Sequence, residues 1–321
     1  MAVYKIFPEK DTYISSKYPN DNFGRDEILE ISNHPDNIRE SLLFFDIDNI
    51  QDLIDSLNIK DYQVYLKLYL SRATITSDEY SLNTHILADD FQMGTGRSGD
   101  FPNPQNGVTY NNITSSIIFS LDHPFYYSTN KDINVEITQL VKKGVDEGIL
   151  NILLNYDSGT LENYQNTDYF SMDTHTIYPP HIELKWNDSI YSSSINEISN
   201  NFYTDITNLK SDYYEDEEVI FRIKSRDVFP TRNFQTSSLY LNSKILPETS
   251  YWSIEDIKTN EVIINFDEKY TKISADDNGN YFKTYMNGLQ PERYYKILIK
   301  TIIHDEIIIK EIPNYFKIKS K

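Results

Sequence analysis

Residues 39–47, RESLLFFDI, decide how the first half of this chain is interpreted. In an extended strand Leu43, Phe45 and Ile47 point to one side, and Leu42 and Phe44 point to the other. Turn-forming residues at 33–37 precede the segment. A short run that is apolar on both faces is typical of a central strand covered on both sides. We therefore expect the first half of the chain to be a β-sandwich built around this strand.

The composition supports sheets and excludes several classes of protein. The 321 residues include 26 Tyr and 16 Phe, and aromatic enrichment favours strands. The net charge of −19 argues against an extended phosphate-binding surface, so we expect no direct nucleic-acid role. The absence of Cys excludes disulfides, thiolate nucleophiles and Cys-based zinc sites. No apolar stretch approaches the roughly 18 residues of a membrane span, and residues 1–10 do not resemble a secretion signal, so we expect no membrane association.

Alternating apolar residues predict the strands of residues 1–187, and helical spacing predicts two short helices. The strands are expected at residues 2–7, 11–14, 27–31, 62–70, 149–156 and 181–186. The first helix follows Asp46, and Asp48 is predicted to cap it, with Gln51 three residues later. The second helix ends at Gly148. The long segment 89–110 has no regular period, which is typical of a functional or structured surface loop.

A Ser- and Asn-rich stretch divides the chain. Residues 188–201 have no sustained period and are interpreted as a linker. After them the pattern consists of short strands only, for example at Val219, Phe221 and Ile223, which is typical of a β-sandwich. The predicted fold class is all-β, with domains at 1–187 and 202–321.

The first domain resembles the DNRLRE family, whose jelly-roll fold is related to carbohydrate-binding modules. The residues that carry the resemblance are Phe7, Pro8, Asp11, Tyr13, Ile14, Pro19, Asn22, Gly24, Asn37, Arg39, Leu42, Leu43, Phe45, Asp46, Gly94, Gly96, the stretch 106–110, the stretch 135–141 and the stretch 180–184. The resemblance implies a jelly roll with two short helices, in which Arg39 and Asp46 have structural roles. Phe91 and Tyr110 stand where related sequences often have Trp.

The second domain resembles a fibronectin-III or Ig-like sandwich. Residues 288–295, GLQPERYY, match the Leu-x-Pro-x-x-x-Tyr pattern at Leu289, Pro291 and Tyr295. The resemblance implies a tyrosine corner, in which Tyr295 buries its ring and its hydroxyl bonds to the backbone near Leu289.

The combination of domains, together with residues 226–234 and 246–252, is similar to virion proteins of tailed, crAss-like bacteriophages. This resemblance implies contacts with other subunits. Arg and aromatic residues are enriched at interface cores. The predicted interface residues are Arg226, Phe229, Arg232 and Phe234, with Phe91 and Tyr110 at the glycine-rich loop.

The sequence offers little for metal binding or catalysis. The six histidines, His34, His85, His123, His175, His181 and His304, have no metal-ligand spacing. The sequence has no EF-hand spacing, but it has candidate oxygen ligands for a structural Ca²⁺ at Asp46, Asp48, Asp89 and Asp90. Neither a Gly-x-Ser-x-Gly motif nor a P-loop occurs. We therefore expect no cofactor, no resident metal and no enzymatic activity.

The main hypothesis is a non-enzymatic structural protein of a tailed-phage virion. It would be assembled in the host cytoplasm as a symmetric homo-oligomer, forming a neck or tail ring, a collar or a fibre adaptor with other virion proteins. The alternative is a carbohydrate-binding module protein of the cell surface or secretome, with a glycan stacked on Phe91 and Tyr110. A third hypothesis, a glycosidase or lyase, requires paired carboxylates in a cleft.

Overall fold

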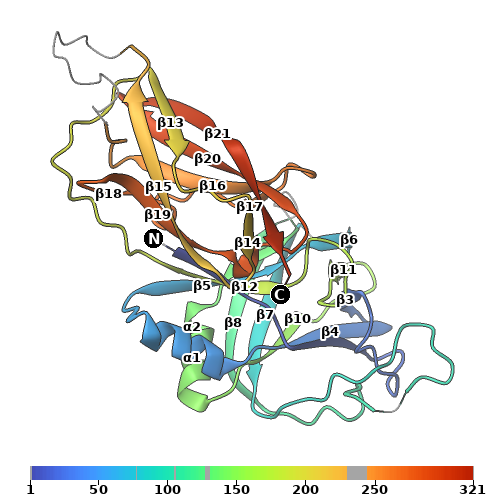
Figure 1. Cartoon of the computed structure of the whole chain (residues 1–321). Helices are drawn as coiled ribbons and strands as arrows, with labels where there is room; N and C mark the ends of the chain where they lie inside the picture. The colour runs from blue at the N-terminus through green and yellow to red at the C-terminus, as the bar shows by residue number, and fades with distance from the viewer. Residues whose placement is uncertain (1, 77, 105, 127–130, 230–243, 321) are drawn as a thin grey trace, which may run out of the picture. The chain divides into compact units, whose positions relative to one another are not determined.

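The computed structural model describes residues 2–76, 78–104, 106–126, 131–229 and 244–320 (Figure 1). The regular secondary structure of the described chain is mostly β-strand, so the protein is all-β, as predicted. Contacts divide it into two units, Ile6–Leu184 and the remainder, which combines Met1–Lys5 with Lys185–Lys321. The chain passes from one unit to the other within β1 (Ala2–Ile6) and within β12 (His181–Trp186).

The unit Ile6–Leu184 contains a large antiparallel sheet and a small one. The large sheet has eight strands, in the order β6-β11-β3-β4-β10-β7-β8, with β2 paired to β4. Its strands are β2 (Lys10–Ser15), β3 (Ile28–His34), β4 (Asn37–Phe44), β6 (Leu70–Ile75), β7 (Glu79–Leu87), β8 (Ile117–Tyr126), β10 (Asn151–Tyr156) and β11 (Gln165–Phe170). In the small sheet β12, β5 (Tyr62–Leu68) and β9 (Ile133–Glu136) follow in this order.

Strand β4 is the central strand that the opening segment predicts. It pairs antiparallel with β2, β3 and β10. Leu42 and Leu43, which point to opposite faces, are both fully buried. Leu42 lies in a cluster with Ile14 and Leu153, whereas Leu43 points to the other face of the sheet. Both faces of this strand are therefore covered.

Two ten-residue helices complete this unit and pack against each other (Figure 1). Helix α1 (Ile47–Ser56) is capped by Asp46, whose carboxylate accepts a hydrogen bond of 3.0 Å from the Asp48 N–H. The prediction of Asp48 as the cap is wrong, because Ile47 is already helical and buries its side chain. Helix α2 (Thr138–Glu147) ends at the left-handed Gly148 (φ 71°), as predicted. Across the described ranges, no helix combines the length and apolarity that a bilayer crossing requires.

The second unit is a sandwich of two sheets. One has the order β13-β15-β19-β18 and the other β14-β21-β20-β16-β17. The strands are β13 (Phe202–Ile206), β14 (Asp212–Tyr214), β15 (Glu218–Asp227), β16 (Ser250–Asp256), β17 (Val262–Ile264), β18 (Ser274–Asp276), β19 (Gly279–Tyr285), β20 (Tyr294–Ile303) and β21 (Glu306–Lys319). Trp252 and Phe282 stack in its core, with ring centres 4.8 Å apart. Within the stretch interpreted as a linker, Ile198 is buried in this same core.

A tyrosine corner closes this sandwich beside the short 3₁₀ turn η2 (Met286–Gly288). Tyr295 is 1% exposed, and its hydroxyl donates a hydrogen bond of 3.0 Å to the Gln290 carbonyl oxygen. Leu289 is buried next to this carbonyl, and Pro291 is exposed in the turn that follows. The bond ties the start of β20 to the segment that leads into it.

We expect Tyr295→Phe to lower the free energy of unfolding by about 1–2 kcal/mol, because it leaves the Gln290 carbonyl without this donor. Chemical denaturation of the full chain measures this change. Tyr214→Phe, at a half-exposed tyrosine of the same unit, is the control and should change stability by less than about 0.5 kcal/mol. Equal stabilities of the two variants would contradict the role of the corner.

Asp11 is a buried carboxylate in the interior of the first unit. It is 2% exposed, and its carboxylate accepts a hydrogen bond of 2.7 Å from the Met172 N–H. Burial raises the pKa of Asp11 to about 7, and the Met172 hydrogen bond only partly opposes this shift. In the unfolded chain an Asp titrates near pH ~3.9. The folded protein therefore retains, between about pH 4 and pH 7, a proton that the unfolded chain releases.

The contribution of Asp11 to stability is accordingly complete below about pH 4 and is lost as the pH rises to about 7. Asp11→Asn stays neutral and can still accept the Met172 hydrogen bond, so it should remove this loss. The unfolding free energy of Asp11→Asn relative to wild type should rise between pH 4 and pH 8, by a value on the order of 4 kcal/mol at most. Denaturant titrations across this pH range test the prediction, and parallel pH profiles would refute it.

Candidate functional site

The connection between β7 and β8 covers one face of the large sheet. Its residues Phe91 and Val108 are each 7% exposed and pack against Leu42 and Leu153 of the sheet. Tyr110 and Ile113 are partly buried at the edge of this cluster. The long segment that the sequence marks as a functional or structured loop is therefore the second cover of the central strand.

Asn22 holds this loop in place. It is fully buried, and its amide N–H groups donate to the Met93 and Val108 carbonyl oxygens at 2.8 and 3.0 Å. Its amide oxygen accepts from the N–H groups of Gly96 and Gly24 at 2.9 and 3.3 Å. One side chain thus satisfies three backbone groups of the loop, which has no regular secondary structure to pair them, and a fourth at Gly24.

The glycines of the loop let its backbone approach Asn22 closely. A Cβ atom added to Gly96 would overlap the Asn22 carbonyl oxygen, and one added to Gly107 would overlap the Asn22 amide. A second amide, Asn103, exchanges two hydrogen bonds with the Asn22 backbone, at 2.8 and 2.9 Å. These contacts explain why glycines occur here and why the stretch is not a phosphate-binding loop: the converging N–H donors already have an acceptor.

A groove of about 480 Å³ lies where the two ends of the loop meet. Leu87, Phe91 and Val108 form its apolar floor. Polar residues form the walls: Asp89, Asp90, Gln92, Asn106, Asn112, Thr114 and Ser115. Backbone hydrogen bonds from Val108 to Gln92 and from Ala88 to Ser116 hold the walls together, at 2.8 and 2.9 Å. The groove therefore combines an apolar surface with hydrogen-bonding groups on a fixed frame.

The two carboxylates of the groove have different surroundings. Asp90 receives both a hydrogen bond of 2.8 Å from the Phe91 N–H and an ion pair of 2.7 Å from Lys10, whose ammonium lies 4.5 Å from the centre of the Phe44 ring. Asp89 is exposed at the groove, and its backbone N–H donates to the Ser115 hydroxyl at 2.9 Å. Asp89 is thus the carboxylate with more capacity to accept hydrogen bonds from a ligand.

The structure separates the predicted interface residues. Phe91 and Tyr110 belong to the cluster under the loop, so the ring of Phe91 offers no exposed face for a sugar. In the other unit the Arg226 guanidinium lies 5.0 Å from the centre of the Tyr203 ring, and Phe229 is 83% exposed. Arg232 and Phe234 lie outside the described residues. A role of these side chains in subunit contacts stays a prediction.

The structural residues have defined partners. Arg39 forms an ion pair with Glu30 of the neighbouring strand β3, and Asp46 caps α1. Across the ranges that the structure describes, no three His, Asp or Glu side chains gather as they would around a metal ion. The groove residues Gln92 and Thr114 were missed by sequence reasoning, because single polar residues 22 positions apart in an aperiodic loop give no signal.

A family model of carbohydrate-binding module family 96 matches residues 2–90. A search of curated proteins found no match. Among solved structures, β-glucuronidase from Parabacteroides merdae is 10% identical, with 96% of this chain and 30% of that chain covered and a TM-score of 0.20. A putative β-galactosidase from Bacteroides fragilis is 9% identical, with 97% and 41% covered and a TM-score of 0.24. The chain spans less than half the length of these proteins, and at such TM-scores they support no conclusion about it.

The family match overturns the phage hypothesis. It points to a carbohydrate-binding domain rather than to the DNRLRE-type domain of a virion protein. The predictions of a structural virion function, of neck, tail or fibre partners in a symmetric homo-oligomer, and of a virion location are therefore wrong. The physical reason is that β-sandwiches serve many unrelated functions, so short scaffold motifs do not identify the partner.

We expect Asn22→Ala to lower the free energy of unfolding by about 3 kcal/mol or more, because it leaves buried groups of four residues without their partner. Thermal and denaturant unfolding of the full chain measure the loss. Asn20→Ala, at an exposed amide two residues before Asn22, is the control and should cost less than about 1 kcal/mol. A similar cost for both variants would show that the loop does not depend on Asn22.

Proposed function

We propose that the chain binds a glycan without transforming it, and that the groove of the first unit is the binding site. The observation that carries the proposal is the match of residues 2–90 to carbohydrate-binding module family 96. The matched segment includes Asp89 and Asp90, which form part of the groove wall.

The chemistry of the groove suits a sugar. A pyranose ring has apolar C–H faces and a rim of hydroxyl groups, so it requires an apolar surface next to hydrogen-bond donors and acceptors. Partly buried Ile113 supplies the apolar surface, together with the small exposed parts of Leu87, Phe91 and Val108. The side chains of Gln92 and Thr114 can each donate and accept hydrogen bonds, and the Asp89 carboxylate can accept them. The volume of 480 Å³ lies within the usual range of about 300–1,000 Å³ for small-ligand sites.

The rigid frame reduces the cost of binding. Asn22 fixes the loop before any ligand arrives, so little ordering of the backbone remains to oppose association. Three direct hydrogen bonds contribute roughly 0.5–1.5 kcal/mol each. With partial burial of the ring on the groove floor, we expect a Kd on the order of 0.1–1 mM for a short oligosaccharide.

Such an affinity fits a module that keeps a protein near a polymer. A polymeric glycan offers many repeats, and repeated weak contacts become firm attachment through effective concentration. We infer that the chain acts at a cell surface or in the surrounding medium, where polymeric glycans occur. This location replaces the predicted location in a virion.

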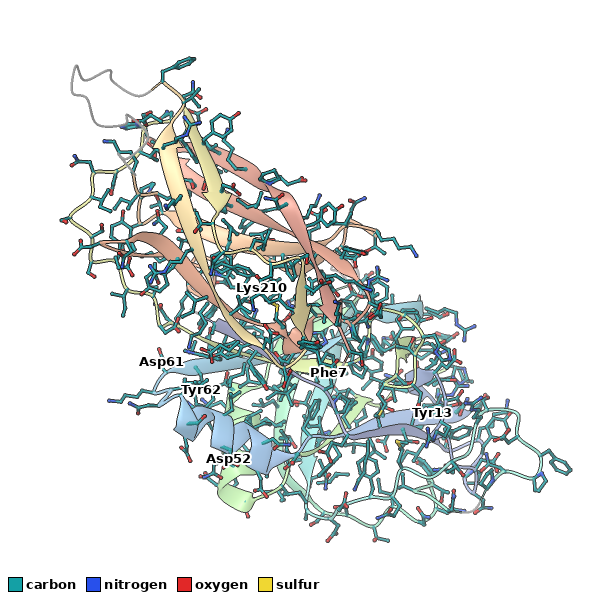
Figure 2. All side chains as sticks on the ribbon, in the orientation of Figure 1. Phe7, Tyr13, Asp52, Asp61, Tyr62 and Lys210 are labelled. Atoms are coloured by element: carbon teal, nitrogen blue, oxygen red, sulfur yellow. The ribbon has the colours of Figure 1, made fainter. Side chains whose placement is uncertain are left out.

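We expect the full chain to bind at least one polysaccharide saturably on a glycan array. Asp89→Ala and Gln92→Ala should each raise Kd by up to roughly tenfold, because each removes one hydrogen bond at the groove. The matched control is Asp52→Ala on the exposed face of α1, which makes the same change of charge away from the groove (Figure 2). Isothermal titration calorimetry measures the three affinities.

The proposal predicts no cleavage, so reducing ends should not accumulate when the bound polysaccharide is incubated with the protein. Binding by wild type that both groove variants leave unchanged would refute the site. Absence of binding to every glycan on the array, or turnover of one, would refute the function.

A further inference from the structure

The second unit has a cleft of its own. It has a volume of about 640 Å³ and is lined by Ile257, Lys258, Glu292, Arg293, Tyr294 and Tyr315. The cleft lies where the turn after β16 meets the start of β20 and the last part of β21. All of its residues belong to this unit.

Two exposed tyrosines dominate the cleft. Tyr294 is 49% exposed and Tyr315 is 59% exposed, and their rings meet edge to face with centres 5.8 Å apart at 83°. The pairing of Tyr294 with Lys317 and of Lys296 with Tyr315 places them on one face of the β20–β21 ladder. Next to them Ile257 is 37% exposed. Three large apolar side chains in contact with water at one concave site are typical of a binding surface.

A buried ion pair fixes one wall of the cleft. Asp256 is fully buried, and its carboxylate accepts two hydrogen bonds from the Arg293 guanidinium, at 2.5 and 2.8 Å. The same carboxylate accepts from the N–H groups of Lys258 and Thr259 at 2.9 and 2.8 Å. Burial alone would raise the pKa of Asp256, but the hydrogen bonds from Arg293 and Thr259 hold it below its usual value. The turn that carries Ile257 and Lys258 is therefore anchored to the residue before Tyr294.

The backbone of the cleft is strained at the residue before Arg293. Glu292 is left-handed (φ 62°), which is uncommon for a residue with a side chain, and its N–H donates to the Ile318 carbonyl at 2.7 Å. Its carboxylate pairs with Lys317, whose ammonium lies 5.9 Å from the centre of the Tyr294 ring. Non-glycine residues in this conformation cluster at ligand sites, where surrounding contacts hold them.

We propose that this cleft is a second glycan-binding site, which takes an uncharged pyranose unit of a polysaccharide; the inference rests on the proposed function. The angled tyrosine rings offer an apolar surface for the C–H face of the sugar, and their hydroxyl groups meet its rim. The Lys258 ammonium adds three N–H donors. Because Arg293 pairs with Asp256, and Lys317 with Glu292, these four charges are balanced within the protein.

The size of the cleft favours a sugar over a protein partner. Six residues line it, whereas a stable protein interface uses about 20–30 residues on each side. The volume lies within the range of small-ligand sites, and the anchored backbone limits the ordering that binding requires. A second copy of the chain or an apolar peptide would need a wider apolar surface than one tyrosine pair and one isoleucine.

The test uses the full chain and calorimetric titration with soluble hexasaccharides of β-1,4-linked glucose, mannose and xylose, and of α-1,4-linked galacturonate. Wild type should bind two molecules of one neutral hexasaccharide per chain. Tyr315→Ala and, independently, Tyr294→Ala should reduce the number of sites from two to one. Tyr214→Ala, at a half-exposed tyrosine of the same unit outside the cleft, should leave two sites.

The double variant Asp89→Ala/Gln92→Ala separates the two proposals. Loss of one binding event with this variant and of the other with Tyr315→Ala supports both sites. Loss only with Tyr315→Ala supports the cleft and refutes the groove. Two binding events in both tyrosine variants, or a single event in wild type that both tyrosine variants retain, refutes the cleft; the groove still stands if Asp89→Ala/Gln92→Ala removes a binding event. Preference of the cleft for galacturonate, no hexasaccharide binding by wild type, or self-association in sedimentation that Tyr315→Ala abolishes would each overturn the proposal.

Discussion

The first unit depends on one constraint: β4 is buried on both of its faces. Adjacent residues Leu42 and Leu43 point in opposite directions, and both are fully removed from water. A two-sheet sandwich covers the interior face only, so the other face requires a further cover. The β7–β8 connection provides it through Phe91 and Val108.

A cover without regular secondary structure has a second requirement. The backbone groups of the connection are buried against the sheet and need partners, because unpaired groups there cost about 1–3 kcal/mol each. Asn22 supplies three of these partners from a different part of the chain. The groove is a consequence: its walls are the two ends of the connection that Asn22 and the backbone bonds hold together. The groove thus results from the way in which the β7–β8 connection packs on the sheet.

Several predictions failed where a local pattern had two solutions. Asp46 and Asp48 both can cap a helix that begins nearby, and the burial of Ile47 decides in favour of Asp46. Phe91 follows two acidic residues in a glycine-rich loop, which suggests exposure, yet the apolar face of the sheet buries it. The arginines and aromatics of residues 226–234 suggested virion neighbours, but such residue types recur at many kinds of binding surface.

The sequence by itself determined the all-β class, the central strand that includes residues 39–44, the second helix ending at Gly148 and the pairing of Tyr295 with the backbone near Leu289. These features depend on residues close together in the chain, whose periods and turn chemistry are directly visible. Only the tertiary structure decided which face the β7–β8 connection covers, which amide holds it, and that Ile257, Tyr294 and Tyr315 share one cleft. Those arrangements join residues tens of positions apart through side-chain packing and hydrogen bonds, and no local pattern encodes them.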